Sequence, residues 1–174
     1  MERTLIIFKP DALQRGIVGE IMSRFERVGL KMIAAKMAQP DHEHFYYHYE
    51  DIGQMISRRG QAAFDVTLEM MQAGPVLAVV LEGVEAVAQV RKMVGTTEPK
   101  SAEPGTIRGD YAHISFSYAD KHSIGIPNLI HASGDPEEAT KEIAHWFSDK
   151  ELFGYDAPHE KFTQTRREHF SKAS

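Results

Sequence analysis

The sequence predicts an α+β fold of the β-α-β-β-α-β type, with a helical pair inserted between its second and third strands. Apolar runs typical of buried strands alternate with segments of helical periodicity. The chain of 174 residues is 42% hydrophobic, which is enough for one packed core. The final helix also has a strong capping signal. A doubly wound α/β sheet is the alternative, because the pattern alone does not fix the order of the strands.

Two strands and three helical stretches are predicted in the first part of the chain. Leu5–Phe8 is an apolar run suited to a buried strand. Val18–Val28 places apolar residues at i, i+3, i+4 and i+7, which predicts an amphipathic helix. Leu30–Met37 predicts the second strand. Asp41 is a candidate N-cap for the first helix of the inserted pair, and Gln61–Gln72 is the second.

The middle of the chain predicts a strand, a helix and a long loop. Val76–Leu81 is an uninterrupted, valine-rich apolar run between turn residues, so it predicts a strand. Valines at helical spacing from Val87 to Val94 form the inner face of the next helix. Gly95–Pro127 shows little sign of regular structure, and a segment of this length indicates a functional loop. Within it, the alternating pattern of His113–Tyr118 allows a short extra strand.

The last strand and the last helix follow this loop. Leu129–Ser133 is the strand. Asp135 is the expected N-cap of the helix, followed at once by proline and three residues later by glutamate. We therefore expect a single domain over residues 1–174, with a core of about 3–150 and a polar C-terminal extension of about 151–174.

Composition excludes several classes of protein. The formal net charge of −5 argues against a dedicated nucleic-acid or membrane binder. The chain has no cysteine, which excludes disulfides, thiolate metal sites and a cysteine nucleophile. The first apolar run is too short for a signal peptide or a membrane span, so we expect a cytoplasmic location.

His131 is the candidate nucleophile. It stands near the end of a short apolar run between Asn128 and Ser133, and a neutral imidazole near pH 7 can attack an electrophile. Glu142 lies eleven residues later, about two turns into the following helix. It is a candidate to hold one ring nitrogen and leave the other free, although an exposed helical glutamate is the simpler interpretation.

The long loop and its flanks are rich in side chains that bind phosphate. Arg91, Thr97 and Arg108 supply guanidinium and hydroxyl donors. The sequence contains no glycine-rich phosphate loop and no dinucleotide-binding motif. His44 and His48 are one helical turn apart, but no further ligand is fixed beside them, so a metal site there is disfavoured.

Taken together, these motifs resemble the nucleoside diphosphate kinases. The Pro-Gly-Thr-Ile-Arg-Gly-Asp stretch and the Asn-x-x-His-x-Ser stretch are the most specific parts of the resemblance. The matching segments follow the same order along most of the chain, and they are Ile7–Asp11, His48-Tyr49, Ala73–Pro75, Leu81–Gly83, Arg91–Gly95, Glu98-Pro99, Pro104–Asp110, Asn128–Ser133 and Lys141–Ile143.

The resemblance implies a ferredoxin-like core with a four-stranded antiparallel sheet. It also implies a ping-pong reaction with low base specificity, in which the γ-phosphate of a nucleoside triphosphate such as ATP moves to His131 and then to a nucleoside diphosphate. Mg²⁺ would be bound through the nucleotide phosphates and not by the protein. The family usually forms hexamers, less often tetramers or dimers, so we expect a homo-oligomer.

The same resemblance implies roles for individual residues. Glu142 would orient His131, with Ser133 in the same network. The remaining contacts to phosphate and sugar would come from Lys9, Tyr49, Arg91, Thr97, Arg108 and Asn128. Phe64 is the candidate for the phenylalanine that stacks on the base. Its assignment depends on an insertion at about 50–62, and a second insertion falls at about 109–127.

Two other functions remain open at this point. One is a catalytically silent member of the same fold that binds nucleotide or acts as a scaffold. The other is a ferredoxin-like regulatory domain for a small metabolite, which would leave Asn128, His131 and Glu142 without a role. Labelling of the protein by ATP separates the kinase from both.

Overall fold

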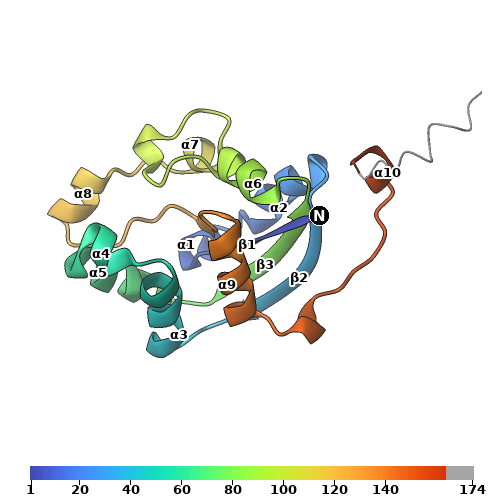
Figure 1. Ribbon diagram of the computed structural model, residues 1–174. Helices are drawn as coiled ribbons and strands as arrows, with labels where there is room; N and C mark the ends of the chain where they lie inside the picture. The colour runs from blue at the N-terminus through green and yellow to red at the C-terminus, as the bar shows by residue number, and fades with distance from the viewer. Residues whose placement is uncertain (164–174) are drawn as a thin grey trace, which may run out of the picture.

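The computed structural model describes residues 1–163, which form a four-stranded sheet with helices on both faces (Figure 1). The strands are β1 (Glu2–Phe8), β2 (Lys31–Ala38), β3 (Val76–Gly83) and β4 (Ile130–Ala132). Their order is β2-β3-β1-β4, and every neighbouring pair is antiparallel. The predicted ferredoxin-like fold is confirmed. The doubly wound alternative is wrong, because it requires parallel neighbours.

Helices and shorter helical turns connect the strands and follow the last of them in the part of the chain that the structure describes. The α-helices are α1 (Pro10–Gln14), α2 (Val18–Arg27), α3 (His42–Tyr46), α4 (Met55–Arg59), α5 (Gln61–Gln72), α6 (Ala86–Val94), α7 (Ile107–Tyr111), α8 (Phe116–Lys121), α9 (Pro136–Trp146) and α10 (Glu160–Thr163). The other helical turns are the π-helix η1 (Tyr47–Ile52) and the 3-10 turns η2 (Pro99–Ser101) and η3 (Asp149–Glu151).

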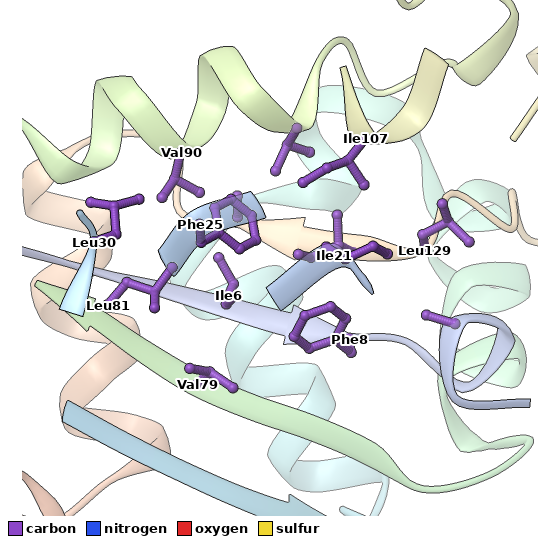
Figure 2. Close-up of a cluster of buried hydrophobic side chains, with 14 of the residues drawn as sticks. Ile6, Phe8, Ile21, Phe25, Leu30, Val79, Leu81, Val90, Ile107 and Leu129 are labelled. Carbon is purple, nitrogen blue, oxygen red and sulfur yellow. The ribbon is translucent and has the colours of Figure 1, made fainter. Parts of the chain in front are cut away.

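Alternation along the central strands divides the core into two layers. Ile6 and Phe8 of β1 pack with residues of α2 and α6, as Figure 2 shows around Phe25 and Val90. Leu5 and Ile7 point to the other face, where α3, α5 and α9 cover the sheet. Because both faces are covered, β1 and β3 are almost continuously apolar.

The cap signals read from the sequence are confirmed at two helices. The Asp41 side chain accepts a hydrogen bond from the backbone N–H of His44 at 2.9 Å, and Asp135 accepts one from Glu138 at 2.8 Å. The inserted pair is more divided than expected, because η1 and α4 precede α5. Gly60, with φ of +87°, separates α4 from α5.

The segment from Gly95 to Pro127 contains more regular structure than expected. It includes η2, α7 and α8, and the extra strand allowed at His113–Tyr118 is wrong. Ser115 ends the extended stretch by accepting a hydrogen bond from the N–H of Tyr118 at 3.1 Å, which starts α8 instead. These helices are too short to show an apolar periodicity, so the capping residues are the sequence signal that could predict them.

The described part of the C-terminal extension lies along the outer edge of β2. The N–H of Phe153 donates to the carbonyl of Ile33 at 2.8 Å, and the Tyr155 hydroxyl donates to that of Met32 at 2.9 Å. Lys31 Nζ donates a hydrogen bond to Glu160 Oε1 at 2.6 Å. The rest of the expected extension, 164–174, lies outside the described residues. Within residues 1–163, no helix combines the length and the apolar character needed to cross a membrane.

Candidate active site

The sheet places His131 on one face of its edge strand. β4 pairs with β1 so that His131 lies opposite Ile7. Ile130 and Ala132 belong to the layer under α6, so the alternation turns the His131 side chain to the opposite face, toward α9. Leu129, with φ of +72°, makes the turn into the strand, and its N–H donates to the Asp11 carboxylate at 3.0 Å.

Glu142 holds the His131 ring from the first turns of α9. Its Oε1 accepts a hydrogen bond from His131 Nε2 at 2.7 Å, and its Oε2 accepts one from the Ser133 hydroxyl at 2.6 Å. Ser133 Oγ is itself fixed by the N–H of Leu5 at 3.1 Å. Glu142 is only 1% exposed, so the simpler interpretation of an exposed helical glutamate is wrong. Among the described residues, nothing bonds His131 Nδ1.

Burial keeps the His131 ring neutral. The pKa of His131 falls to about 3, mainly through burial, with the charge of Glu138 opposing and that of Lys9 adding to the shift. At neutral pH the ring therefore carries its proton on Nε2, facing Glu142, and an electron pair on Nδ1. Burial raises the pKa of Glu142, but the two donors that point at it suit a carboxylate.

His48 and Tyr49, on η1, form the surroundings of this pair. The His48 ring lies perpendicular to that of His131, with centroids 4.6 Å apart, and Trp146 Nε1 donates to His48 Nδ1 at 3.2 Å. Burial lowers the pKa of His48 to about 3, so it too is neutral. The buried Tyr49 hydroxyl has no partner among the described residues, and burial raises its pKa, so it remains a free donor.

Ligand atoms of His48, His131 and Glu142 lie within 4.8 Å of one another, which is close enough for a metal ion. The hydrogen bonds from Trp146 and between His131 and Glu142 already use the facing atoms. We therefore interpret this group as a hydrogen-bond network. His44 does not join this group, and its ring stacks on that of His145, with ring centroids 3.9 Å apart.

A cavity of about 410 Å³ opens in front of His131, within the usual size of a small-molecule site. Its lining includes six of the residues predicted from the sequence, namely Lys9, Arg91, Thr97, Arg108, Asn128 and His131. Lys9 Nζ donates to Asn128 Oδ1 at 2.7 Å, and Asn128 Nδ2 donates to the Thr97 carbonyl at 2.8 Å. Burial, aided by the charge of Arg108, lowers the pKa of Lys9 to about 7.

Arg108 joins the long loop to the active strand. Its guanidinium donates to the carbonyls of Gly95 at 3.0 Å, Asn128 at 3.2 Å and Ile130 at 2.6 Å. Burial lowers its pKa to about 10, so it remains a cation at neutral pH. Thr106 caps the helix that carries it by accepting a hydrogen bond from Gly109 at 3.1 Å. The Pro104–Asp110 stretch therefore places the positive charge of Arg108 at the cavity and ties the loop to the start of β4.

The cavity carries two further cations that the sequence reasoning missed. Arg58 and Arg59, at the end of α4, line it with Lys9, Arg91 and Arg108. Among the described residues, the carboxylates in this lining are Asp135 and Glu138, and each accepts a hydrogen bond from a nearby backbone N–H. An excess of cations selects a polyanion. The sequence signal that could have identified them is the pair of arginines before Gly60, in the segment already expected to be an insertion.

Phe64 does not reach the cavity. Its side chain is 3% exposed in the layer beneath α5, and its ring meets that of Tyr46 edge-on, with centroids 5.5 Å apart. A ring buried in this way has no face for a nucleotide base. The structure therefore contradicts the assignment of Phe64 as the stacking residue, which was made by counting across an insertion.

A sequence profile of the family described as nucleoside diphosphate kinase matches residues 2–152. This chain is a member of that family. The kinase of Borreliella burgdorferi is 45% identical over 157 residues, covering 89% of this chain and 92% of that protein. That of Pyrococcus horikoshii is 46% identical over 154 residues, covering 88% and 90%.

Solved structures of nucleoside diphosphate kinases have the same fold. A transition-state mimic of the Borrelia burgdorferi enzyme with vanadate and ADP superposes with a TM-score of 0.90 at 42% identity, covering 94% of this chain and 96% of that one. The Halobacterium salinarum enzyme in complex with CDP gives a TM-score of 0.78 at 36% identity, covering 93% and 97%. The predicted resemblance is confirmed.

Proposed function

We propose that this chain is a nucleoside diphosphate kinase that moves a phosphoryl group through a phosphohistidine at His131. The observation that carries the proposal is the 2.7 Å bond between His131 Nε2 and the buried Glu142, in front of a cationic cavity. This contact supports the tautomer with the proton on Nε2, in which Nδ1 is the nucleophile. Family membership and the transition-state mimic of a relative with ADP and vanadate support the same reaction.

In the first half-reaction, the Nδ1 electron pair attacks the γ-phosphorus of a nucleoside triphosphate. The bond from this phosphorus to the oxygen bridging to the β-phosphate breaks, and that oxygen leaves with the diphosphate. The phosphorylated ring becomes cationic while it keeps its proton on Nε2, and the Glu142 carboxylate stabilises that charge. A second nucleoside diphosphate then attacks the phosphohistidine and reverses these steps.

The cavity side chains would stabilise the transferred group. Its transition state is loose and rich in charge, so catalysis depends on positioning and on nearby cations. Lys9, Arg91 and Arg108 supply cations next to His131, and Thr97 adds a hydroxyl at the same cavity. The partnerless Tyr49 hydroxyl supplies a neutral donor beside the His131 ring. Lys9 and Asn128, already bonded to each other, would contact the sugar.

Mg²⁺ fits this cavity as an ion that arrives with the phosphates. The two lining carboxylates, Asp135 and Glu138, already accept backbone N–H groups, so the protein offers no cage of free carboxylates. When bound, Mg²⁺ neutralises charge on phosphate oxygens.

A cytoplasmic location, a single domain and a homo-oligomer, most often a hexamer, belong to the same proposal. The single domain rests on the length of the chain, and the homo-oligomer rests on the family and not on contacts in this chain. Light scattering on purified protein tests the assembly, and a particle with the mass of a single chain contradicts it.

The decisive experiment is a two-step labelling assay on wild type and on His131→Gln. The protein is incubated with γ-labelled ATP and Mg²⁺, isolated, and then given unlabelled GDP or dCDP. We expect label that is acid-labile and base-stable, is absent from the variant and passes into GTP or dCTP. A folded wild type that binds nucleotide but takes up no label would refute the kinase and favour the catalytically silent alternative.

A further inference from the structure

Among residues 1–163, no phenylalanine, tyrosine or tryptophan offers the cavity a platform for a nucleotide base. Phe64 is buried elsewhere. A base exposes two flat apolar faces, so a site that binds it needs a flat partner. Met55 and Ile126 line the cavity and offer apolar atoms, but neither side chain is planar.

The Arg59 guanidinium is a planar group that lines this cavity and packs against an aromatic ring. Its guanidinium carbon lies 4.0 Å from the centroid of the Phe116 ring, at the start of α8. Guanidinium groups are planar and weakly hydrated, and they stack on aromatic rings and on bases. The half-buried Phe116 therefore holds the guanidinium in place from one side.

The contact joins the two segments that the family resemblance marks as insertions, at about 50–62 and 109–127. Arg59 ends α4 in the first, and Phe116 begins α8 in the second, which lies beside α4 in Figure 1. Gly125 supports the same arrangement, since a Cβ there would lie 2.5 Å from the Val66 carbonyl oxygen of α5. The two insertions are thus packed against each other at the cavity.

Arg59 has no competing partner. Within residues 1–163, no carboxylate or carbonyl accepts a hydrogen bond from its guanidinium, whereas the neighbouring Arg58 donates to the Gly53 carbonyl at 3.1 Å. The charge of Arg59 also helps to lower the pKa of Lys9, so both groups act on the same cavity. The guanidinium is therefore free to meet a ligand.

We propose that the Arg59 guanidinium, backed by Phe116, is the surface on which the nucleotide base stacks. The inference rests on the proposed function, because it assumes that the cavity binds nucleotides. Stacking of this kind tolerates every base, since each has a π-face, and purines gain more contact area than pyrimidines. The two insertions would then supply the base contact that the family resemblance assigns to a phenylalanine.

Binding measurements on Arg59→Lys and Arg59→Ala separate stacking from charge. Lysine keeps the cation but loses the plane. We expect both variants to weaken ADP binding by about tenfold in calorimetry, as loss of a stacking partner does. The same variants should weaken the binding of UDP by a smaller factor than the binding of ADP. The ADP affinity of Phe116→Leu should lie between those of wild type and Arg59→Ala. Arg27→Lys, an exposed position on α2 away from the cavity, is the matched control and should bind as wild type.

Inorganic tripolyphosphate, which has no base, completes the test. Its affinity should be unchanged in Arg59→Lys and within about twofold in Arg59→Ala. Wild-type affinity of Arg59→Lys for ADP, or an equal loss for ADP and tripolyphosphate, would overturn the proposal and make Arg59 a phosphate ligand. Because calorimetry needs no turnover, failure of the stacking proposal is distinguishable from failure to form phosphohistidine, which the labelling assay reports.

Discussion

Glu142→Gln isolates the charge that faces the nucleophile. Glutamine has nearly the same shape, and its carbonyl can still accept from His131 Nε2. Its amide N–H₂ would meet Ser133 Oγ, which can turn its proton to the Leu5 carbonyl, now 3.3 Å away. The network therefore survives the substitution with only the negative charge removed.

The size of the effect follows from the hydrogen bond to His131. A hydrogen bond to a charged group contributes about 1.5–3 kcal/mol, and a neutral one contributes about 0.5–1.5 kcal/mol. We take this difference, about 1–2 kcal/mol, as the order of magnitude of the extra stabilisation that the carboxylate gives the ring once the ring becomes cationic. Since about 1.4 kcal/mol corresponds to a tenfold change in rate, we expect phosphorylation of His131 to slow by about 5- to 30-fold.

Single-turnover labelling by γ-labelled ATP at saturating concentration measures this rate directly. The melting temperature of the variant is the control. Burial raises the folded-state pKa of Glu142 above its unfolded value, so the ionised carboxylate costs stability as the pH rises through the folded pKa. Glutamine removes that cost, and the variant should melt no lower than wild type at pH 7. A labelling rate within twofold of wild type would refute the assigned role of Glu142.

Two further predictions concern Lys9 and Phe64. The pKa of Lys9 is lowered to about 7, so the side chain is protonated below this pH and neutral above it; ADP should therefore bind more weakly at pH 8 than at pH 6.8. Calorimetry on Lys9→Arg provides the comparison, because arginine stays charged, and an equal pH dependence in both proteins would contradict the assignment. Phe64→Ala should lower the free energy of unfolding by about 3–5 kcal/mol in a urea titration, as for a buried ring. Its Kd for ADP should stay at the wild-type value, and a selective loss of ADP affinity with little loss of stability would restore Phe64 as a base contact.

The elements with long apolar periodicity could be predicted from the sequence. All four strands lie where apolar runs placed them, and α2, α5, α6 and α9 match their predicted segments within a few residues. The order of the strands required more, because β1 pairs with β4 about 120 residues away, and a local pattern does not contain that contact. The family resemblance supplied it.

The candidate site shows the same limit. His131, Glu142 and the Lys9–Asn128 pair stand at motif positions whose spacing the chain keeps, so their proximity could be anticipated. Phe64 and Arg59 belong to a segment of altered length. In such a segment, counting residues from a motif does not tell which face of a helix a residue lies on. The packing of α4 and α5 decides which side chain enters the cavity and which enters the core.

The chain closes one edge of its own sheet. Residues 153–160 occupy the carbonyl groups of Met32 and Ile33 on β2, and the buried Lys31 anchors them through Glu160. An open edge is a template on which a second copy can add its own strand. A neighbouring strand cannot pair with Met32 and Ile33 of β2 without first displacing residues 153–160, so this end of the edge is closed to strand addition.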